Sequence, residues 1–134
     1  MSGARLLIVD DDADVSAMAA LVLRRAGHTV TAVDSGPMAL AQIGQIRYDL
    51  ILLDINMPGM DGWEVLRILK ADDATAAIPV AMFSVRGEVR DQVHGLQEGA
   101  IDYITKPFGV DELASRVATI LERRTATGSG GARW

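Results

Sequence analysis

The 134-residue chain contains no cysteine and only two histidines, His28 and His94. Disulfide bonds, thiolate metal sites and cysteine nucleophiles are therefore excluded, and so is a histidine-rich metal site. Aromatic residues make up only 4% of the chain, too few for a platform on which nucleic-acid bases could stack. The formal charge of −5 opposes contact with a polyphosphate backbone. We therefore expect no direct nucleic-acid binding by this domain.

Long apolar runs are also missing. None approaches the roughly 20 residues that a membrane-spanning helix requires. The N-terminus lacks the apolar region and the small-residue cleavage site of a signal peptide. Neither a GxxxxGK[ST] loop nor a GxGxxG turn occurs, which excludes the nucleotide-binding folds built on those motifs. These absences predict a cytoplasmic protein that makes no contact with a membrane.

The apolar residues that are present, 49% of the chain, are arranged in short runs of strand length separated by helical patterns. Runs dense in leucine, isoleucine and valine do not alternate with polar residues, as expected for strands covered on both faces. The predicted strands are 6–9, 29–33, 50–53, 78–83 and 101–104. The predicted helices are about 15–26, 34–46, 63–70, 88–98 and 110–121.

Strand and helix alternate five times, which favours a parallel sheet with right-handed crossovers. The predicted fold is a flavodoxin-like α/β sandwich of three layers: a doubly wound, five-stranded parallel sheet in the order 2-1-3-4-5 with five helices. The length of the chain fits one domain, which we place at residues 1–124. Residues 125–134 are small, polar and rich in glycine, and are expected to form a flexible tail or the start of a linker.

Polar residues stand at the carboxyl ends of four of the predicted strands. Residues 10–12 are all aspartate and follow the first strand, Asp54 ends the third, Ser84 ends the fourth and Lys106 follows the fifth. Taken singly, each is compatible with an ordinary helix cap or turn, and Asp12 or Asp14 is expected to cap the first helix. Asp54 is followed by a loop sequence instead of a helix start. In the predicted strand order these groups meet at one edge of the sheet.

Neighbouring strands lie about 4.8 Å apart, so Asp11 and Asp54 are expected to face each other across the crevice. Carboxylates this close are tolerated only with a cation between them or with raised pKa values. Oxygen ligands without histidine or cysteine favour Mg²⁺. Lys106 would add a fixed positive charge and Ser84 a hydroxyl donor. Together they predict a site that handles a phosphoryl group, with Asp54 as a nucleophile that needs no general base.

Four segments of the chain resemble the receiver domain of bacterial two-component response regulators. They are LLIVDDD (6–12), DLILLDINMPGMDG (49–62), IPVAMFS (78–84) and GAIDYITKPF (99–108). The resemblance covers about residues 4–124, and the order and spacing of the four segments make it specific.

The resemblance implies that Asp54 accepts a phosphoryl group from a sensor histidine kinase, a phosphotransfer protein or a small phosphodonor. It implies Mg²⁺ as the cofactor, with Mn²⁺ as a substitute. Asp11 and Asp54 would ligate the ion directly, Asn56 would do so through its backbone carbonyl, and Asp10 would act through a water molecule.

Ser84 and Lys106 would hold phosphoryl oxygens, and Tyr103 would be the aromatic residue that swings inward as Ser84 closes on the phosphate. The bond between Lys106 and Pro107 is expected to be cis. The chain has Val85 where the family usually has a smaller residue, which could narrow access to Asp54.

In this family the output surface is formed by the fourth helix, the fifth strand and the fifth helix, and it would control a downstream protein or an output domain. Arg86-Gly87-Glu88, Asp102 and Arg116 resemble the receivers of winged-helix DNA-binding regulators, which dimerise through salt bridges on this surface. On the same surface we select Arg90, Asp102 and Arg116. They form the candidate dimerisation face, although Ile101 stands at a position that is often acidic there. A solvated charged face is the simpler interpretation of the same residues.

Two other functions remain open from the sequence. One is a receiver-like interaction module that works without phosphorylation, although such modules generally lack one of the acidic, hydroxyl or lysine positions found here. The other is a phosphatase of the haloacid dehalogenase type, which carries its nucleophile on the first strand and needs a larger chain. A receiver is a signalling switch that catalyses only its own phosphorylation and dephosphorylation, so we do not expect a metabolic enzyme.

Overall fold

A computed structural model describes residues 3–85 and 97–129 of the chain, and for residues 84, 85 and 124–129 it describes the backbone only. Five parallel strands form one sheet in the order β2-β1-β3-β4-β5, which confirms the predicted order. The strands are β1 (Arg5–Val9), β2 (Thr29–Val33), β3 (Leu50–Asp54), β4 (Val80–Val85) and β5 (Asp102–Lys106).

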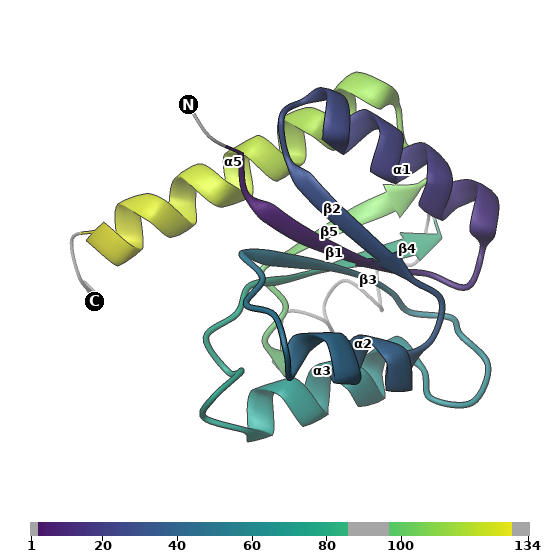
Figure 1. Cartoon of the computed structure of the whole chain (residues 1–134), viewed down its shortest axis with the longest axis vertical. Helices are drawn as coiled ribbons and strands as arrows, with labels where there is room; N and C mark the ends of the chain where they lie inside the picture. Colours follow the sequence, from purple (N-terminus) through teal and green to yellow (C-terminus); the bar gives the residue numbers. More distant parts are fainter. Residues whose placement is uncertain (1–2, 86–96, 130–134) are drawn as a thin grey trace.

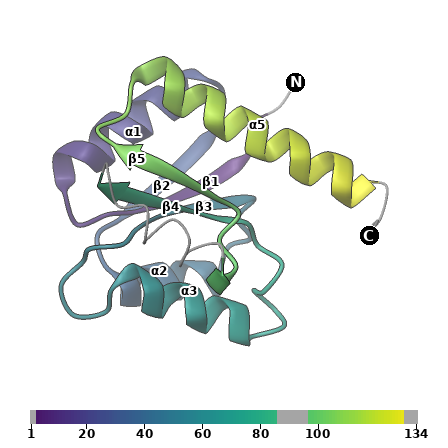
Figure 2. The same cartoon turned by 180° about the vertical axis from the view of Figure 1, so that it is seen from behind.

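Helices cover both faces of the sheet. They are α1 (Ala13–Arg25), α2 (Gly36–Ile43), α3 (Gly62–Ala71) and α5 (Val110–Ser129). α1 and α5 lie on one face and α2 and α3 on the other, as Figure 1 shows and Figure 2 repeats from behind. The described residues therefore contain four helices, and the predicted helix at 88–98 falls mostly outside them. No helix in this described part has the length and apolar character needed to cross a membrane.

The core consists of two apolar layers, one on each face of the sheet. Along β1, Leu7 and Val9 pack into the layer beneath α2 and α3, whereas Leu6 and Ile8 pack into the layer beneath α1 and α5. All four side chains are fully buried. Successive strand residues point to opposite faces, so a strand covered on both sides must be apolar at every position. This explains the continuous apolar runs of the sequence.

Three of the helices that begin at the carboxyl edge of the sheet are preceded by a polar side chain that accepts a hydrogen bond from a backbone amide of the first turn. Asp12 caps α1, Ser35 caps α2 and Asp61 caps α3. The prediction that Asp12 or Asp14 caps the first helix is confirmed for Asp12, whose Oδ1 accepts from the amide of Asp14 at 3.0 Å. The caps fix where the loops that carry the candidate site end.

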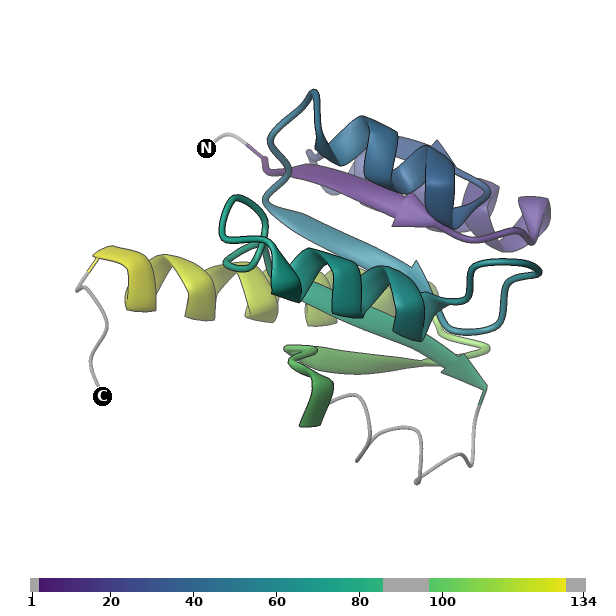
Figure 3. The same ribbon diagram turned by 90° about the horizontal axis from the view of Figure 1, so that it is seen from below.

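Helix α5 is longer than the sequence predicts. It continues to Ser129, past residue 124, after which we placed the flexible tail. Residues 125–127 contain neither glycine nor proline, so nothing in them interrupts helical hydrogen bonding. The end of α5 extends beyond the sheet and the other helices (Figure 3).

Candidate functional site

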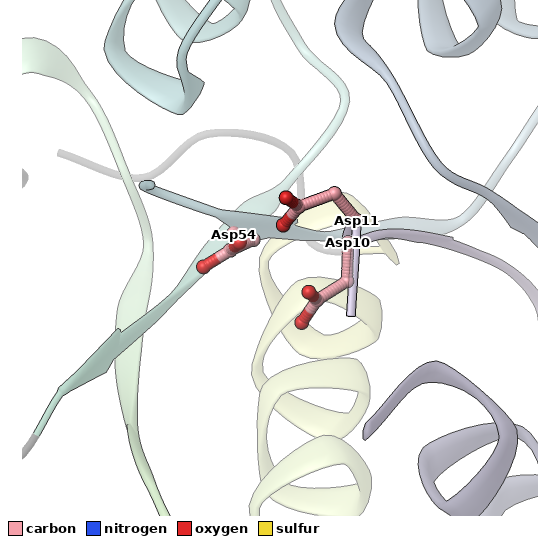
Figure 4. Close-up of side chains that lie close together, drawn as sticks. All are labelled: Asp10, Asp11 and Asp54. Carbon is pink, nitrogen blue, oxygen red and sulfur yellow. The ribbon is translucent and has the colours of Figure 1, made fainter. Parts of the chain in front are cut away.

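Three carboxylates come together at the carboxyl edge of the sheet, where β1 and β3 end. Asp10 and Asp11 directly follow β1, and Asp54 is the last residue of β3. One oxygen from each of the three lies within 4.8 Å of the others. Figure 4 shows the three side chains gathered at the strand ends. The predicted meeting of Asp11 with Asp54 across adjacent strands is present in the structure.

The three carboxylates differ in their surroundings. Asp10 is 1% exposed and Asp54 5% exposed, whereas Asp11 is open to solvent. The backbone amide of Asp10 donates to the carbonyl of Val33 at 3.1 Å, which ties the end of β1 to the end of β2. Asp10 Oδ1 accepts from the amide of Asp12 at 2.9 Å. The site therefore has two buried carboxylates, Asp10 and Asp54, and a third, Asp11, that is exposed to solvent.

Lys106, at the end of β5, supplies the positive charge of the site. Its Nζ lies 2.8 Å from Asp10 Oδ2 and 3.2 Å from Asp54 Oδ1. The same ammonium lies 5.7 Å from the centroid of the Phe83 ring, which stacks on Phe108. The peptide bond that follows Lys106 is cis, as the resemblance implied. One ammonium thus bridges carboxylates from two other strands.

Burial and charge together set the protonation of the site. Burial raises the pKa of Asp54, and the neighbouring Asp10 carboxylate raises it further, to about 6, although Lys106 and the Asn56 backbone amide act in the opposite direction. Burial alone would lower the pKa of Lys106, but its hydrogen bonds and ion pairs with Asp10 and Asp54 leave it above the ordinary value. At neutral pH Asp54 is therefore mostly ionised and Lys106 is charged.

The residues fit a hard divalent cation. Three carboxylates against one ammonium leave an excess of negative charge at the strand ends. Burial is the main cause of the raised pKa of Asp54, and the charge of Asp10 adds to it. The carboxylate oxygens lie close enough together to bind one ion, without histidine or cysteine. An all-oxygen donor set is the one that Mg²⁺ and Ca²⁺ prefer.

The loop that follows β3 is closed just behind Asp54. The backbone amide of Gly62 donates to the carbonyl of Ile55 at 2.9 Å, so the chain returns to β3 as α3 begins. A methyl group on Gly62 would lie 2.3 Å from the backbone oxygen of Asp54. Within the loop, the backbone amide of Asn56 favours the ionised form of the Asp54 carboxyl and so acts to lower its pKa. Sequence analysis assigned no structural role to Gly62, although the residue directly follows the cap of α3.

Two of the other predicted site residues lie in the described strands. Ser84 lies in β4 next to Thr105 of β5, and its side chain is outside the described part of the structure. Tyr103 is 7% exposed and packs in the apolar layer beneath α2 and α3, so its ring is already inside. The predicted inward swing of Tyr103 and the closing of Ser84 remain predictions.

The candidate dimerisation face is only partly described. Arg90 is outside the described residues. Asp102 and Arg116 pair within the chain, with Arg116 Nη2 2.7 Å from Asp102 Oδ1, and Arg116 also donates to the backbone oxygen of Tyr103. Arg123, another charged residue of the same face, lies 3.5 Å from Asp102 Oδ2. Arg123 follows Arg116 by about two helical turns, which places the two residues on the same side of α5.

Comparison with protein families and sequences gives consistent matches. Residues 6–118 match the family model described as the response regulator receiver domain. The chain is 42% identical over 119 residues to the DNA-binding response regulator MtrA of Mycobacterium tuberculosis, which covers 89% of the chain and 51% of MtrA. It is 42% identical over 132 residues to the phosphate regulon transcriptional regulatory protein PhoB of Pseudomonas aeruginosa, which covers 98% of the chain and 57% of PhoB. The chain thus spans about half the length of these curated relatives.

Solved structures agree in fold. The receiver domain of Francisella response regulator 1452 superposes with a TM-score of 0.83 at 32% identity, over 90% of this chain and 98% of that one. The chemotaxis response regulator CheY4 of Vibrio cholerae gives a TM-score of 0.83 at 28% identity, over 89% of this chain and 99% of that one.

Proposed function

The chain belongs to the response regulator receiver domain family, and from that we propose that Asp54 is the residue that accepts the phosphoryl group. The observation that carries this proposal is the position of Lys106, whose ammonium contacts both Asp54 and Asp10. The ionised carboxylate supplies a nucleophile, and the fixed cation beside it supplies positive charge for the oxygens of a transferred phosphoryl group. The donor would be a sensor histidine kinase, a phosphotransfer protein or a small phosphodonor.

A carboxylate oxygen of Asp54 attacks the phosphorus atom of the donor and forms the O–P bond of an acyl phosphate, while the donor's bond to phosphorus breaks. The electron pair of that bond leaves with the donor, on the imidazole nitrogen of a phosphohistidine or on the acetate oxygen of acetyl phosphate. With its pKa raised to about 6, Asp54 is still mostly ionised at pH 7, so no other residue needs to remove a proton. Lys106 holds positive charge beside the incoming phosphoryl oxygens, and its hydrogen bond to Asp54 Oδ1 keeps the carboxylate in place. The Ser84 hydroxyl completes the set of donors in this proposal.

Asp11, Asp54 and the backbone carbonyl of Asn56 would hold Mg²⁺, with Asp10 acting through a water molecule. When bound, Mg²⁺ would neutralise the charge that the phosphoryl group brings, about −1.5 to −2 at neutral pH. Mn²⁺ has a similar preference for oxygen ligands and is expected to substitute.

Phosphorylation would change the affinity of the β5 and α5 surface for a partner. A partner that binds the phosphorylated state better also favours phosphorylation, since the two equilibria are linked. The partner would be a downstream protein or an output domain, and relatives such as MtrA are described as DNA-binding. We also propose dimerisation through the face that includes Arg90, Asp102 and Arg116. Equal sedimentation of the phosphorylated and free forms at high concentration would exclude the dimer.

The decisive experiment is the intact mass after incubation with Mg²⁺ and acetyl phosphate. We expect the gain of one phosphoryl group that requires Mg²⁺ and disappears in Asp54→Asn. Asp61→Asn is the matched control, because Asn also caps a helix and the change removes a carboxylate from the same loop. No gain in folded protein that binds Mg²⁺ would favour the phosphorylation-independent interaction module. Turnover of a small phosphate ester would favour the phosphatase.

A further inference from the structure

The sheet has two open edges among the residues that the structure describes, because β2 and β5 each pair with one strand only. They lie at opposite ends of the sheet, with α1 next to β2 and α5 next to β5 (Figure 1). An open edge presents backbone N–H and C=O groups to which a strand of another molecule can bind. Each edge is therefore a surface at which a second copy of this chain could pair.

At the β2 edge, an arginine of the neighbouring helix occupies a backbone acceptor. The amide of Thr29 donates to the carbonyl of Ala4, just before β1, so Thr29 faces β1. The backbone groups of successive strand residues face opposite sides, so those of Val30 face the open edge. Arg24 Nη2, from α1, donates to the carbonyl of Val30 at 2.9 Å. The first acceptor of this edge is therefore already bonded within the chain.

At the β5 edge, two charged side chains bind both backbone groups of one residue. Asp102 Oδ1 accepts from the amide of Tyr103 at 2.8 Å, and Arg116 Nη2, from α5, donates to the Tyr103 carbonyl. The N–H and C=O of one strand residue face the same side, so those of Tyr103 face the open edge. Arg116 Nη2 also lies 2.7 Å from Asp102 Oδ1, so the two side chains hold each other in place.

We propose that Arg24 and Arg116 close the two edges of the sheet against strand pairing with a second copy of this chain. Each arginine comes from the helix beside its edge and bonds a carbonyl that an incoming strand would need. That strand would have to displace the guanidinium or bury its charge in the new sheet, and burying an unpaired charge is unfavourable. The inference goes beyond the proposed function, because it concerns the chain whether or not Asp54 carries a phosphoryl group.

A single arginine can be sufficient because the edge strands are short. β2 has five residues, and the alternation that turns Val30 outward does the same only for Ala32. Bonding of the Val30 carbonyl to Arg24 therefore leaves the Ala32 carbonyl as the outward acceptor within β2. Short edge strands and charged side chains at the edge are two features that keep natural sheets from pairing with one another.

The test variant carries Arg24→Gln and Arg116→Gln, because glutamine is too short to reach the same carbonyls. The control variant carries Arg25→Gln and Arg123→Gln. Arg25 is the neighbour of Arg24 in the last turn of α1, and Arg123 pairs with Asp102 from the same helix as Arg116. In the described structure neither control arginine bonds a carbonyl of an edge strand. Both variants lose the same charge and become more negative than the wild-type −5, which opposes association.

Self-association is measured by sedimentation velocity without a phosphodonor, well below the unfolding temperature of each variant. We expect the test variant to associate at a protein concentration about tenfold lower than the wild type, and the control variant to behave as the wild type does. The sizes of the assemblies identify the surface. Arg24→Gln or Arg116→Gln alone opens one edge, so like edges pair and the assembly stops at a dimer, whereas the test variant has two open edges and should form longer chains.

Hydrogen exchange separates strand pairing from damage to the fold. In Arg24→Gln, the amide of Ala32 at the β2 edge should exchange more slowly as the protein concentration rises, because a second copy then covers it. Partial unfolding would have the opposite effect and would speed the exchange of amides throughout β2.

Equal self-association of the test and control variants would overturn the inference. Assemblies of the test variant no larger than those of the single variants would overturn it as well, and so would unchanged exchange at Ala32 in associated Arg24→Gln. The dimer proposed for the phosphorylated chain gives a different result. Arg116→Gln should weaken that dimer, whereas it should strengthen the association of the chain without a phosphoryl group.

Discussion

The Nζ atom of Lys106 lies closer to Asp10 Oδ2, at 2.8 Å, than to Asp54 Oδ1, at 3.2 Å. The lysine therefore joins two buried carboxylates instead of pairing with one. Each carboxylate raises the free energy of the other, and the ammonium offsets part of that cost. The stability of the fold is thus coupled to the charges of the site.

Replacing Lys106 with methionine should destabilise the protein. Lys106→Met keeps most of the side-chain volume but leaves Asp10 and Asp54 uncompensated, which we expect to cost about 2 to 3 kcal/mol at pH 7. Urea unfolding at pH 7 and pH 4 measures it, and the cost should shrink at pH 4 as carboxyl groups protonate. Lys70→Met is the control, since Lys70 Nζ donates to the carbonyl of Ala76 and its loss should not depend on pH in this range.

Asp54→Asn should stabilise the protein at neutral pH. The pKa of Asp54 is raised from 3.8 to about 6 on folding, so the folded state holds a proton that the unfolded state has lost between those values. The ionised Asp54 carboxylate destabilises the folded state. This destabilisation is absent below pH 4, grows between pH 4 and pH 6 and is complete above pH 6. We expect Asp54→Asn to gain about 2 kcal/mol at pH 7 without divalent cations, and little at pH 4. An equal gain at both pH values would contradict the assigned cause.

Gly62→Ala should disturb Asp54 through the backbone. The added methyl group would lie 2.3 Å from the Asp54 backbone oxygen, and neither backbone segment can rotate away as a side chain can. We expect a loss of about 2 to 3 kcal/mol in the free energy of unfolding. Gly109→Ala provides the comparison, because Gly109 also lies at the start of a helix but the nearest neighbour of its added methyl group would be 3.9 Å away. Similar losses in both variants would mean that alanine destabilises a helix start in general, and would contradict a specific effect of the contact with the Asp54 backbone oxygen.

His28 should give the fold a separate dependence on pH. Its Nδ1 accepts a hydrogen bond from the amide of Ala4 at 3.0 Å. This bond requires a neutral ring whose Nδ1 carries no proton. Burial lowers the pKa of His28 below 6.5, so the folded state binds its proton less readily than the unfolded state. Stability from this bond is complete above pH 6.5 and is lost as the pH falls below it. In His28→Gln, thermal unfolding between pH 5 and 7 should be less dependent on pH; an unchanged slope would contradict this role.

Much of the fold and of the site could be predicted from local patterns. The continuous apolar run of β3 and the aspartate at its end predicted both a buried strand and an acid at the sheet edge, because parallel strands end together. The length of α5 and the pairing of Arg123 with Asp102 could not be predicted in this way. A helix end depends on a few weak local preferences, and an ion pair depends on side-chain directions across two elements.

The sequence by itself determined the two apolar layers and the set of polar residues at the carboxyl edge, because these follow from periodicity along the chain. The alternation of five strands with helices predicted the strand order. Tertiary structure alone decided that Lys106 reaches Asp10 more closely than Asp54, and that Asp54 is desolvated enough for its pKa to rise. Such features depend on distances of a few tenths of an ångström between residues far apart in sequence, which only close packing of the whole chain sets.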